Sequence, residues 1–228
     1  MHASRREFLS QCSVAALTLA AAPHALAAAP VAPAAPPPDA DGAPEWDTSW
    51  TKRLTGKHRA VFDVPEIESG YGVWRASIWG SQYQQVLGAA PKDISTVVVL
   101  RHNGISLAMQ QKFWDRYGVP RSLPVIHPVS EKPTDRNPVL LASSRGEVPA
   151  SFDALALDQA IARGVIVLAC NLAFEDPIAL VVAKDGATPE AARRVALEHL
   201  VPGVIMQPSG VFATVLAQQT GCAYVRAS

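Results

Sequence analysis

The chain has 228 residues, with 20 lysines and arginines balanced by 20 aspartates and glutamates, so its formal net charge at neutral pH is zero. A balanced charge provides no basic surface for nucleic acid or for an anionic membrane, and we exclude both as partners of the mature chain. Three cysteines are too few for a disulfide framework. The composition therefore indicates a globular protein with an apolar core.

The first 27 residues are predicted to be an export signal. Paired arginines at Arg5 and Arg6 are followed by a phenylalanine and a leucine, by a weakly apolar stretch, and by an Ala-x-Ala cleavage site ending at Ala27. The pattern resembles a twin-arginine (Tat) signal, which directs a folded chain to the bacterial periplasm. The apolar stretch is shorter than the roughly 20 residues that a membrane-spanning helix needs. Cleavage leaves Cys170 and Cys222 as the cysteines of the mature protein.

The rest of the chain divides into a linker and one domain. Residues 28–44 are mostly alanine and proline, and they are predicted to form a flexible linker because they cannot bury enough surface to offset the entropy of ordering. Residues 45–228 have the length of one domain. Within it, residues 120–149 are rich in proline and charge and show no periodicity. Connections of this length are usually lids, partner contacts or disordered segments, so we interpret them as an insert.

Apolar patterns in the domain alternate between strand-like and helix-like segments. Strands are predicted over residues 58–64, 94–100, 164–169, 203–207 and 222–226. Helices are predicted over residues 73–87, 107–117 after a Ser106 cap, 151–162, 172–184, 188–200 and 211–220. Residues 178–183 also have strand character, but a helix accounts for more of the segment, and residues 139–142 are predicted as a short edge strand or hairpin. The alternation predicts an α/β fold with a doubly wound, mostly parallel sheet.

Four motifs in the C-terminal half carry a resemblance to a known family. A strand ends in Val-Leu-Ala-Cys-Asn at 167–171, and a helix begins with Thr-Pro-Glu at 188–190. The chain closes with Gly-Val-Ile-Met-Gln-Pro-Ser-Gly-Val at 203–211 and Leu-Ala-Gln-Gln-Thr-Gly-Cys-Ala-Tyr-Val at 216–225. This half resembles the DsrE/DsrF-like family of small α/β proteins, some of which relay sulfur, over about residues 97–225.

The resemblance implies a flavodoxin-like sheet of about five strands with helices on both faces. It also implies a homo-oligomer, commonly a trimer or a stack of two trimers, and it matches Cys170 to the cysteine that carries sulfur in the family. The export signal, the Trp-rich segment before the first strand and the insert at 120–149 depart from the short cytoplasmic members of this family.

Cys170 is the candidate catalytic residue. A thiol at the end of a strand and the start of a helix meets backbone N–H groups and the positive end of the helix dipole, which favours a thiolate or persulfide. The alternative is an inert core cysteine, which is among the commonest buried residues. Whether Cys170 and Cys222 pair is open at this point.

Residues at neighbouring strand ends are expected to complete a site, because parallel strands place their carboxyl ends at one edge of a sheet. The candidate binding residues are His102, Asn103, Asn171, Ser209 and Gly210. His102 is interpreted either as a general acid or base or as a hydrogen-bonding core residue. Ser209 and Gly210 begin a helix whose N-terminus suits an anion.

The remaining histidines and motifs add no cofactor. His58, His102, His127 and His199 show no metal-ligand spacing, so no metal site is predicted. Gly-rich nucleotide fingerprints are absent from the sequence, and no cofactor is expected. Three functions stay open: a periplasmic sulfur relay or thiol carrier, a non-catalytic module binding a small anionic or sulfur ligand, and a structural partner subunit.

Overall fold

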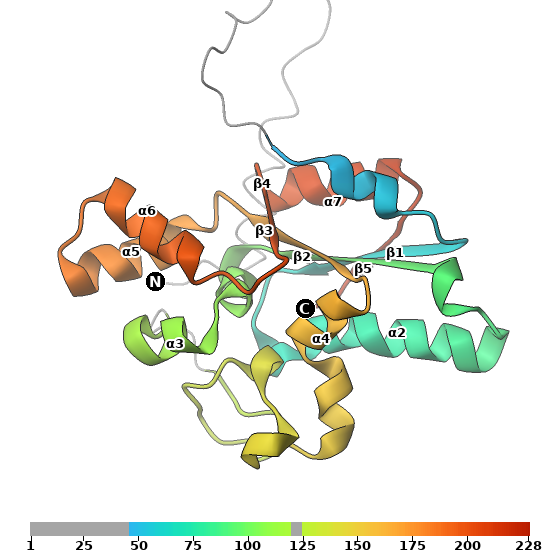
Figure 1. Ribbon diagram of the computed structural model, residues 1–228, viewed down its shortest axis with the longest axis horizontal. Helices are drawn as coiled ribbons and strands as arrows, with labels where there is room; N and C mark the ends of the chain where they lie inside the picture. The colour runs from blue at the N-terminus through green and yellow to red at the C-terminus, as the bar shows by residue number, and fades with distance from the viewer. Residues whose placement is uncertain (1–45, 120–124) are drawn as a thin grey trace, which may run out of the picture. The chain divides into compact units, whose positions relative to one another are not determined.

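The computed structural model describes residues 46–119 and 125–228. The predicted signal and the predicted linker lie outside the described residues. Five parallel strands form one sheet in the order β4-β3-β2-β1-β5 (Figure 1). The strands are β1 (His58–Val64), β2 (Ile94–Leu100), β3 (Ile166–Cys170), β4 (Ile205–Gln207) and β5 (Ala223–Arg226). The predicted flavodoxin-like α/β fold is confirmed.

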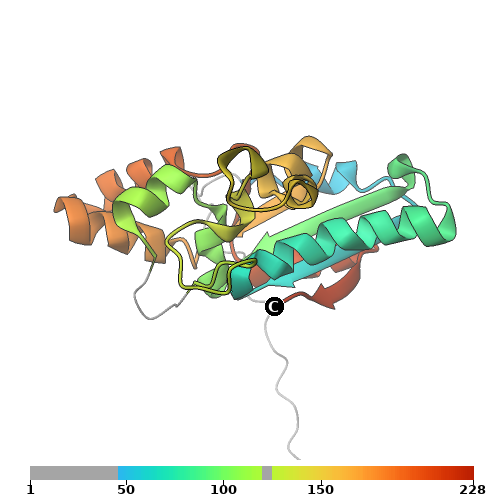
Figure 2. The ribbon, with the colours of Figure 1, turned by 90° about the horizontal axis from the view of Figure 1, so that it is seen from below.

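Helices connect the strands and cover both faces of the sheet (Figures 1 and 2). The α-helices are α2 (Tyr71–Leu87), α3 (Gln111–Tyr117), α4 (Leu157–Ala162), α5 (Glu175–Asp185), α6 (Pro189–Glu198) and α7 (Gly210–Gln219). Short 3₁₀ helices are η1 (Ser49–Arg53), η2 (Glu68–Gly70), η3 (Pro91–Asp93), η4 (His102–Ala108), η5 (Pro138–Leu140), η6 (Ser143–Arg145) and η7 (Ala150–Leu155). No helix in the described part of the chain has the length and hydropathy needed to cross a membrane.

The strand order explains which helix covers which face. From β1 to β4 each new strand joins the same side of the sheet, so right-handed crossovers place their helices on one face. The chain then reverses direction across the sheet to add β5 beside β1, so α7 lies on the opposite face. The carboxyl ends of β1 and β5 therefore flank a point where the strand order reverses, which is where open α/β sheets bind ligands.

Two buried clusters lie on the two faces of the sheet. Val98 and Leu100 of β2 pack in the larger cluster, on the face of α2 and α5. Val97 and Val99 pack in the smaller cluster with Trp50 of η1 and with α7. The alternation is that of a strand buried on both faces.

The predicted helix at 107–117 is shorter than expected, and Ser106 does not cap it. Residues 102–108 form η4, and α3 begins only at Gln111. The intervening backbone is held by tertiary contacts, because the Asn137 side chain donates to the carbonyls of Leu107 and Met109 at 3.1 and 2.7 Å. Met109 also forms an isolated bridge with Leu200. These long-range bonds override the local helical pattern.

Two further predictions in the same part of the chain are corrected. The predicted edge strand or hairpin at 139–142 is replaced by η5, whose Val139 N–H is capped by the Asn137 side chain. The predicted helix at 151–162 is split into η7 and α4 by extended backbone at Ala156, with φ −61° and ψ 145°. The helical pattern at 151–162 predicts the apolar side chains that face the core, but the segment forms two short helices instead of one continuous helix.

Candidate functional site

Cys170 is the last residue of β3 and lies at the carboxyl edge of the sheet, as the strand pattern predicts. It pairs with Gln207 of β4 and is 6% exposed. Its Sγ accepts a hydrogen bond from the backbone N–H of Ala173 at 3.4 Å, in the turn that precedes α5. The thiol therefore lies against a backbone donor at the start of this turn.

A hydrogen-bonded charge network lies on the neighbouring strands. Arg101, directly after β2, donates from Nε and Nη2 to the two carboxylate oxygens of Asp63 in β1, both at 2.7 Å. Tyr224 of β5 donates its hydroxyl to Asp63 Oδ2 at 2.9 Å. The Asp63 side chain is 3% exposed, and that of Arg101 is 32% exposed. Three strands thus meet at one buried carboxylate at the β1–β5 reversal point.

The network and Cys170 lie on the α7 face of the sheet. Val61 and Val99 point into the smaller cluster on that face, and side chains two residues further along a strand point the same way. Asp63 follows Val61 by two residues, and Arg101 follows Val99 by two. The register places Arg101 next to Cys170, because Leu100 pairs with Ala169.

Protonation of the network follows from its contacts. Hydrogen bonds to Asp63 raise the pKa of Arg101, burial opposes the increase, and negative charge on Asp63, Tyr224 or Cys170 adds to it. Burial raises the pKa of Tyr224, and its hydrogen bond to Asp63 raises it further. Tyr224 therefore stays protonated as a donor, and the Arg101 guanidinium is within electrostatic reach of a thiolate on Cys170.

The N-terminus of α7 packs against Arg101. Ser209 caps this helix, because its Oγ accepts from the Phe212 N–H at 3.0 Å. A Cβ on Gly210 would lie 2.5 Å from Arg101 Cδ. Glycine at 210 is therefore what allows the arginine side chain to pass beneath the helix toward Asp63. The predicted residues Ser209 and Gly210 thus lie at this edge and shape the space around Arg101.

On the β4 side of Cys170, a buried amide fixes the sheet edge to the segment before β1. Gln207 is fully buried and accepts from Trp50 Nε1 at 3.2 Å. Its Nε2 donates to the carbonyl of Asp47 at 2.8 Å. Trp50 therefore packs in the smaller cluster, and these bonds attach the segment before β1 to the end of β4.

Three other predicted residues make contacts away from Cys170. Asn103 donates to Glu66 Oε2 at 2.7 Å, and His102 Nδ1 lies 3.3 Å from Glu66 Oε1. Asn171 accepts from the Arg193 guanidinium and lines a groove of about 720 Å³ beside α6 and β4. These three side chains were expected to surround the Cys170 thiol. Their polar contacts instead go to Glu66 and Arg193.

Arg101 and Asp63 were missed from the sequence, although a signal was present. Asp63 is a carboxylate inside an otherwise apolar strand, and Arg101 is a cation at the end of the next strand. A buried charge requires a partner, and these two strands are adjacent in the sheet. A search for opposite charges on consecutive strands would have paired them.

The two cysteines of the domain are free. Cys170 lies level with the end of β2, whereas Cys222 precedes Ala223, which pairs with Ala60 near the start of β1. Six residues along β2 separate the two levels, which is about 20 Å at about 3.3 Å per residue. A disulfide needs Cα atoms within about 7 Å, so the two cannot pair. Burial raises the pKa of Cys222.

No group of three or more His, Cys, Asp or Glu side chains within residues 46–119 and 125–228 is arranged to hold a metal ion. Neither the models of known protein families nor the curated proteins give a match to this chain. The resemblance to the DsrE/DsrF-like family therefore stays a prediction that rests on the sequence motifs.

Proposed function

We propose that this protein is an exported, DsrE/DsrF-like carrier that holds sulfane sulfur on Cys170. The observation that carries the proposal is the placement of this thiol at the carboxyl edge of the sheet, where its Sγ accepts a backbone N–H and the Arg101 guanidinium is in electrostatic reach. The thiolate is the nucleophile in thiol chemistry, and these two groups are the donor and the positive charge that lie beside it. Export through the twin-arginine route is part of the proposal.

The proposed loading step is a sulfur transfer without net oxidation. The Cys170 thiolate attacks the outer sulfur of a small persulfide, R–S–SH. A bond forms between Cys170 Sγ and that outer sulfur, the S–S bond of the donor breaks, and R–S⁻ leaves as a thiolate. Because Cys170 is 6% exposed, we expect a small donor rather than a protein one.

Intact mass spectrometry tests this step on the mature chain, residues 28–228. After incubation with glutathione persulfide, we expect a gain of about 32 Da, the mass of one sulfur atom. Cys170→Ser should abolish the gain. Cys222→Ser is the matched control, and it should load like the unaltered protein, because Cys222 is remote from the site. Absence of the adduct, or an adduct that persists in Cys170→Ser, contradicts the proposal.

The same edge favours a second function, the non-catalytic binding of a small anion. Arg101 uses Nε and Nη2 for Asp63, and among the described residues its Nη1 has no hydrogen-bond partner. The aliphatic part of the same side chain packs against Gly210, the first residue of α7, and a helix N-terminus stabilises an anion. Sulfite is a suitable probe. Sulfite binding that survives Cys170→Ser, without any persulfide adduct, would favour the binding function over the carrier.

Self-association belongs to the proposal as well. Helix α7 exposes Val211, Phe212 and Val215, with 66%, 40% and 46% of each residue accessible. Apolar side chains on one helix are suited to contacts between subunits. Light scattering on the mature chain is expected to give a trimer or hexamer, and a monomer at all concentrations would contradict this part. A role as a structural subunit would instead predict a stable complex that Cys170→Ser leaves intact.

A further inference from the structure

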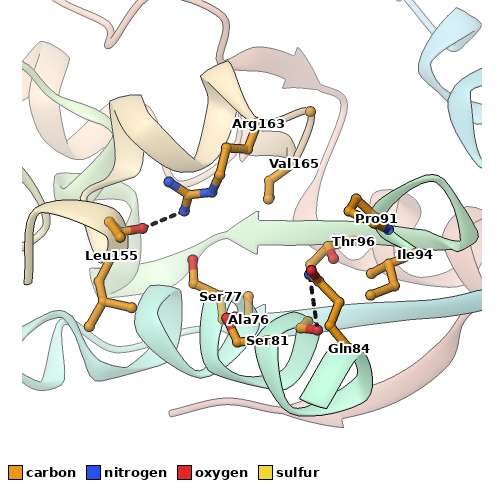
Figure 3. A pocket seen from close by; sticks show the side chains of 13 residues that line it. Ala76, Ser77, Ser81, Gln84, Pro91, Ile94, Thr96, Leu155, Arg163 and Val165 are labelled. Carbon is orange, nitrogen blue, oxygen red and sulfur yellow. Dashed lines mark hydrogen bonds between the residues drawn. The ribbon is translucent and has the colours of Figure 1, made fainter. Parts of the chain in front are cut away.

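A pocket that is partly open to solvent lies far from Cys170, on the other face of the sheet. This cavity of about 390 Å³ is lined by α2, by the amino-terminal half of β2, and by the chain from η7 through the residues that follow α4 (Figure 3). Thr96 lines it from β2, four residues before the end of that strand. The volume is within the range of about 300–1,000 Å³ that small-molecule sites occupy.

Hydroxyl groups line the floor of this cavity. Ser77 and Ser81 are contributed by α2, and Thr96 by β2. The Ser81 hydroxyl donates to the Ser77 carbonyl at 3.2 Å. The Ser77 hydroxyl oxygen is buried and has no hydrogen-bond partner among the described residues. An unpaired buried hydroxyl is unfavourable, so Ser77 is a polar group beside this space that lacks a partner among the described residues.

One positive charge faces these hydroxyls. The Arg163 guanidinium and the Ser77 hydroxyl point into the same space from opposite sides (Figure 3). Arg163 donates from Nη2 to the carbonyl of Ala154, and within the described residues it forms no ion pair. None of the residues lining the cavity is acidic. The space is therefore rich in donors and has a net positive charge.

Apolar side chains complete the wall. Pro91, Ile94, Leu155 and Val165 line the cavity beside the polar groups. Apolar walls favour a hydrocarbon portion in the ligand, and a single guanidinium matches one carboxylate, which it binds through paired N–H donors. We propose that this cavity is a second binding site, which takes a small organic monocarboxylate with its charge on Arg163 and its chain between α2 and Leu155.

Calorimetric titration of the mature chain tests the site with four defined probes. The anions are lactate and pentanoate, and their neutral counterparts are lactamide and pentanamide. At least one anion is expected to bind about tenfold or more tightly than its amide, because only the anion pairs with Arg163. Arg163→Gln is expected to weaken that binding about tenfold. Arg194→Gln, a change of the same kind at an exposed arginine outside the cavity, should leave the affinity unchanged.

A second variant blocks the space without removing a polar group. Gly80 lines the cavity, and a Cβ there would meet only Ile94 Cγ2, at 3.9 Å. Gly80→Leu should therefore fold and exclude the ligand. The site is refuted if neither anion binds below about 10 mM, if Gly80→Leu binds as tightly as the unaltered chain, or if each amide matches its acid. The test is independent of Cys170, so it stands or fails separately from sulfur loading.

Discussion

Arg101 donates a hydrogen bond of 2.7 Å to each carboxylate oxygen of Asp63, whose side chain is only 3% exposed. The arrangement is a bidentate pair with one partner buried and the other reaching the surface. In such a pair, loss of one partner leaves the other as an unpaired buried charge. The free-energy cost of that change exceeds the net contribution of the intact pair to stability.

The first prediction concerns this pair. Arg101→Met should lower the free energy of unfolding by about 2–4 kcal/mol, because Asp63 would keep only the Tyr224 hydroxyl as a partner. The double variant Asp63→Leu with Arg101→Met should recover at least half of the loss, since no buried charge then remains. Urea unfolding measures both. A cost below about 0.5 kcal/mol for Arg101→Met would show that Asp63 does not depend on the arginine.

The second prediction uses two glycines with different surroundings. Gly210→Ala should destabilise the protein by about 1–3 kcal/mol, because the new Cβ would lie 2.5 Å from Arg101 Cδ and would displace the arginine. Gly80→Ala is the control in α2, where the Cβ meets only Ile94 Cγ2 at 3.9 Å. That change should leave stability equal or increase it by up to about 1 kcal/mol through helix propensity. Thermal unfolding of both variants measures the difference. Equal changes in stability would contradict the close approach of Arg101 to Gly210.

The third prediction follows from the separation of the two cysteines. Mild oxidation of the folded mature chain should produce no intramolecular disulfide, because Cys170 and Cys222 lie at opposite ends of the sheet. The same oxidant in strong urea should produce one, since the unfolded chain brings the thiols together. Intact mass, read as the loss of about 2 Da on disulfide formation, distinguishes the two states. A disulfide formed under native conditions would contradict the register described above.

The fourth prediction concerns Glu147, in the segment between α3 and α4. Burial raises the pKa of Glu147, but hydrogen bonds from Arg145 and the Ala142 N–H, with the charge of Arg136, lower it by more, so the pKa falls below its usual 4.5. A lowered pKa in the folded state contributes stability that is fully present above about pH 4.5 and is lost as pH falls through the folded-state pKa.

Glu147→Gln should therefore be less stable than the unaltered chain at neutral pH, with the difference shrinking as pH falls toward about 3. Urea midpoints across this range provide the measurement. Glu175→Gln, at an exposed position with 69% of its side chain accessible, should change stability by less than about 0.5 kcal/mol throughout. A Glu147→Gln difference that stays constant with pH would contradict the assignment.

The local sequence pattern was sufficient to place individual strands of the sheet. The apolar runs at 58–64 and 94–100 coincide with β1 and β2, because a strand buried on both faces needs continuous apolar residues. The Thr188 cap with Pro189 likewise gave the start of α6, where the Thr188 hydroxyl accepts from the Ala191 N–H at 3.3 Å. Where a local signal is complete within a few residues, the sequence predicts the element.

Segments held by distant partners were predicted less well. Asn137 alone accounts for two of the errors, because its side chain ties down the carbonyls before α3 and caps η5. The candidate site also divides into features that local sequence predicts and contacts that it does not. His102 and Asn103 were placed at the correct strand end, but Glu66 binds them both.

The sequence by itself determined that Cys170 ends a buried strand, because that position follows from residues adjacent to it in the chain. Only the tertiary structure decided which groups stand beside the thiol. Asp63 lies on β1, Tyr224 lies on β5, and Arg101 directly follows β2. Arg101 reaches Asp63 because β2 pairs with β1, and Tyr224 reaches it because the chain reverses its direction across the sheet to add β5 on the other side of β1. The hydrogen bonds between them join residues that local periodicity cannot relate, since each depends on strand order, register and the absent side chain of Gly210.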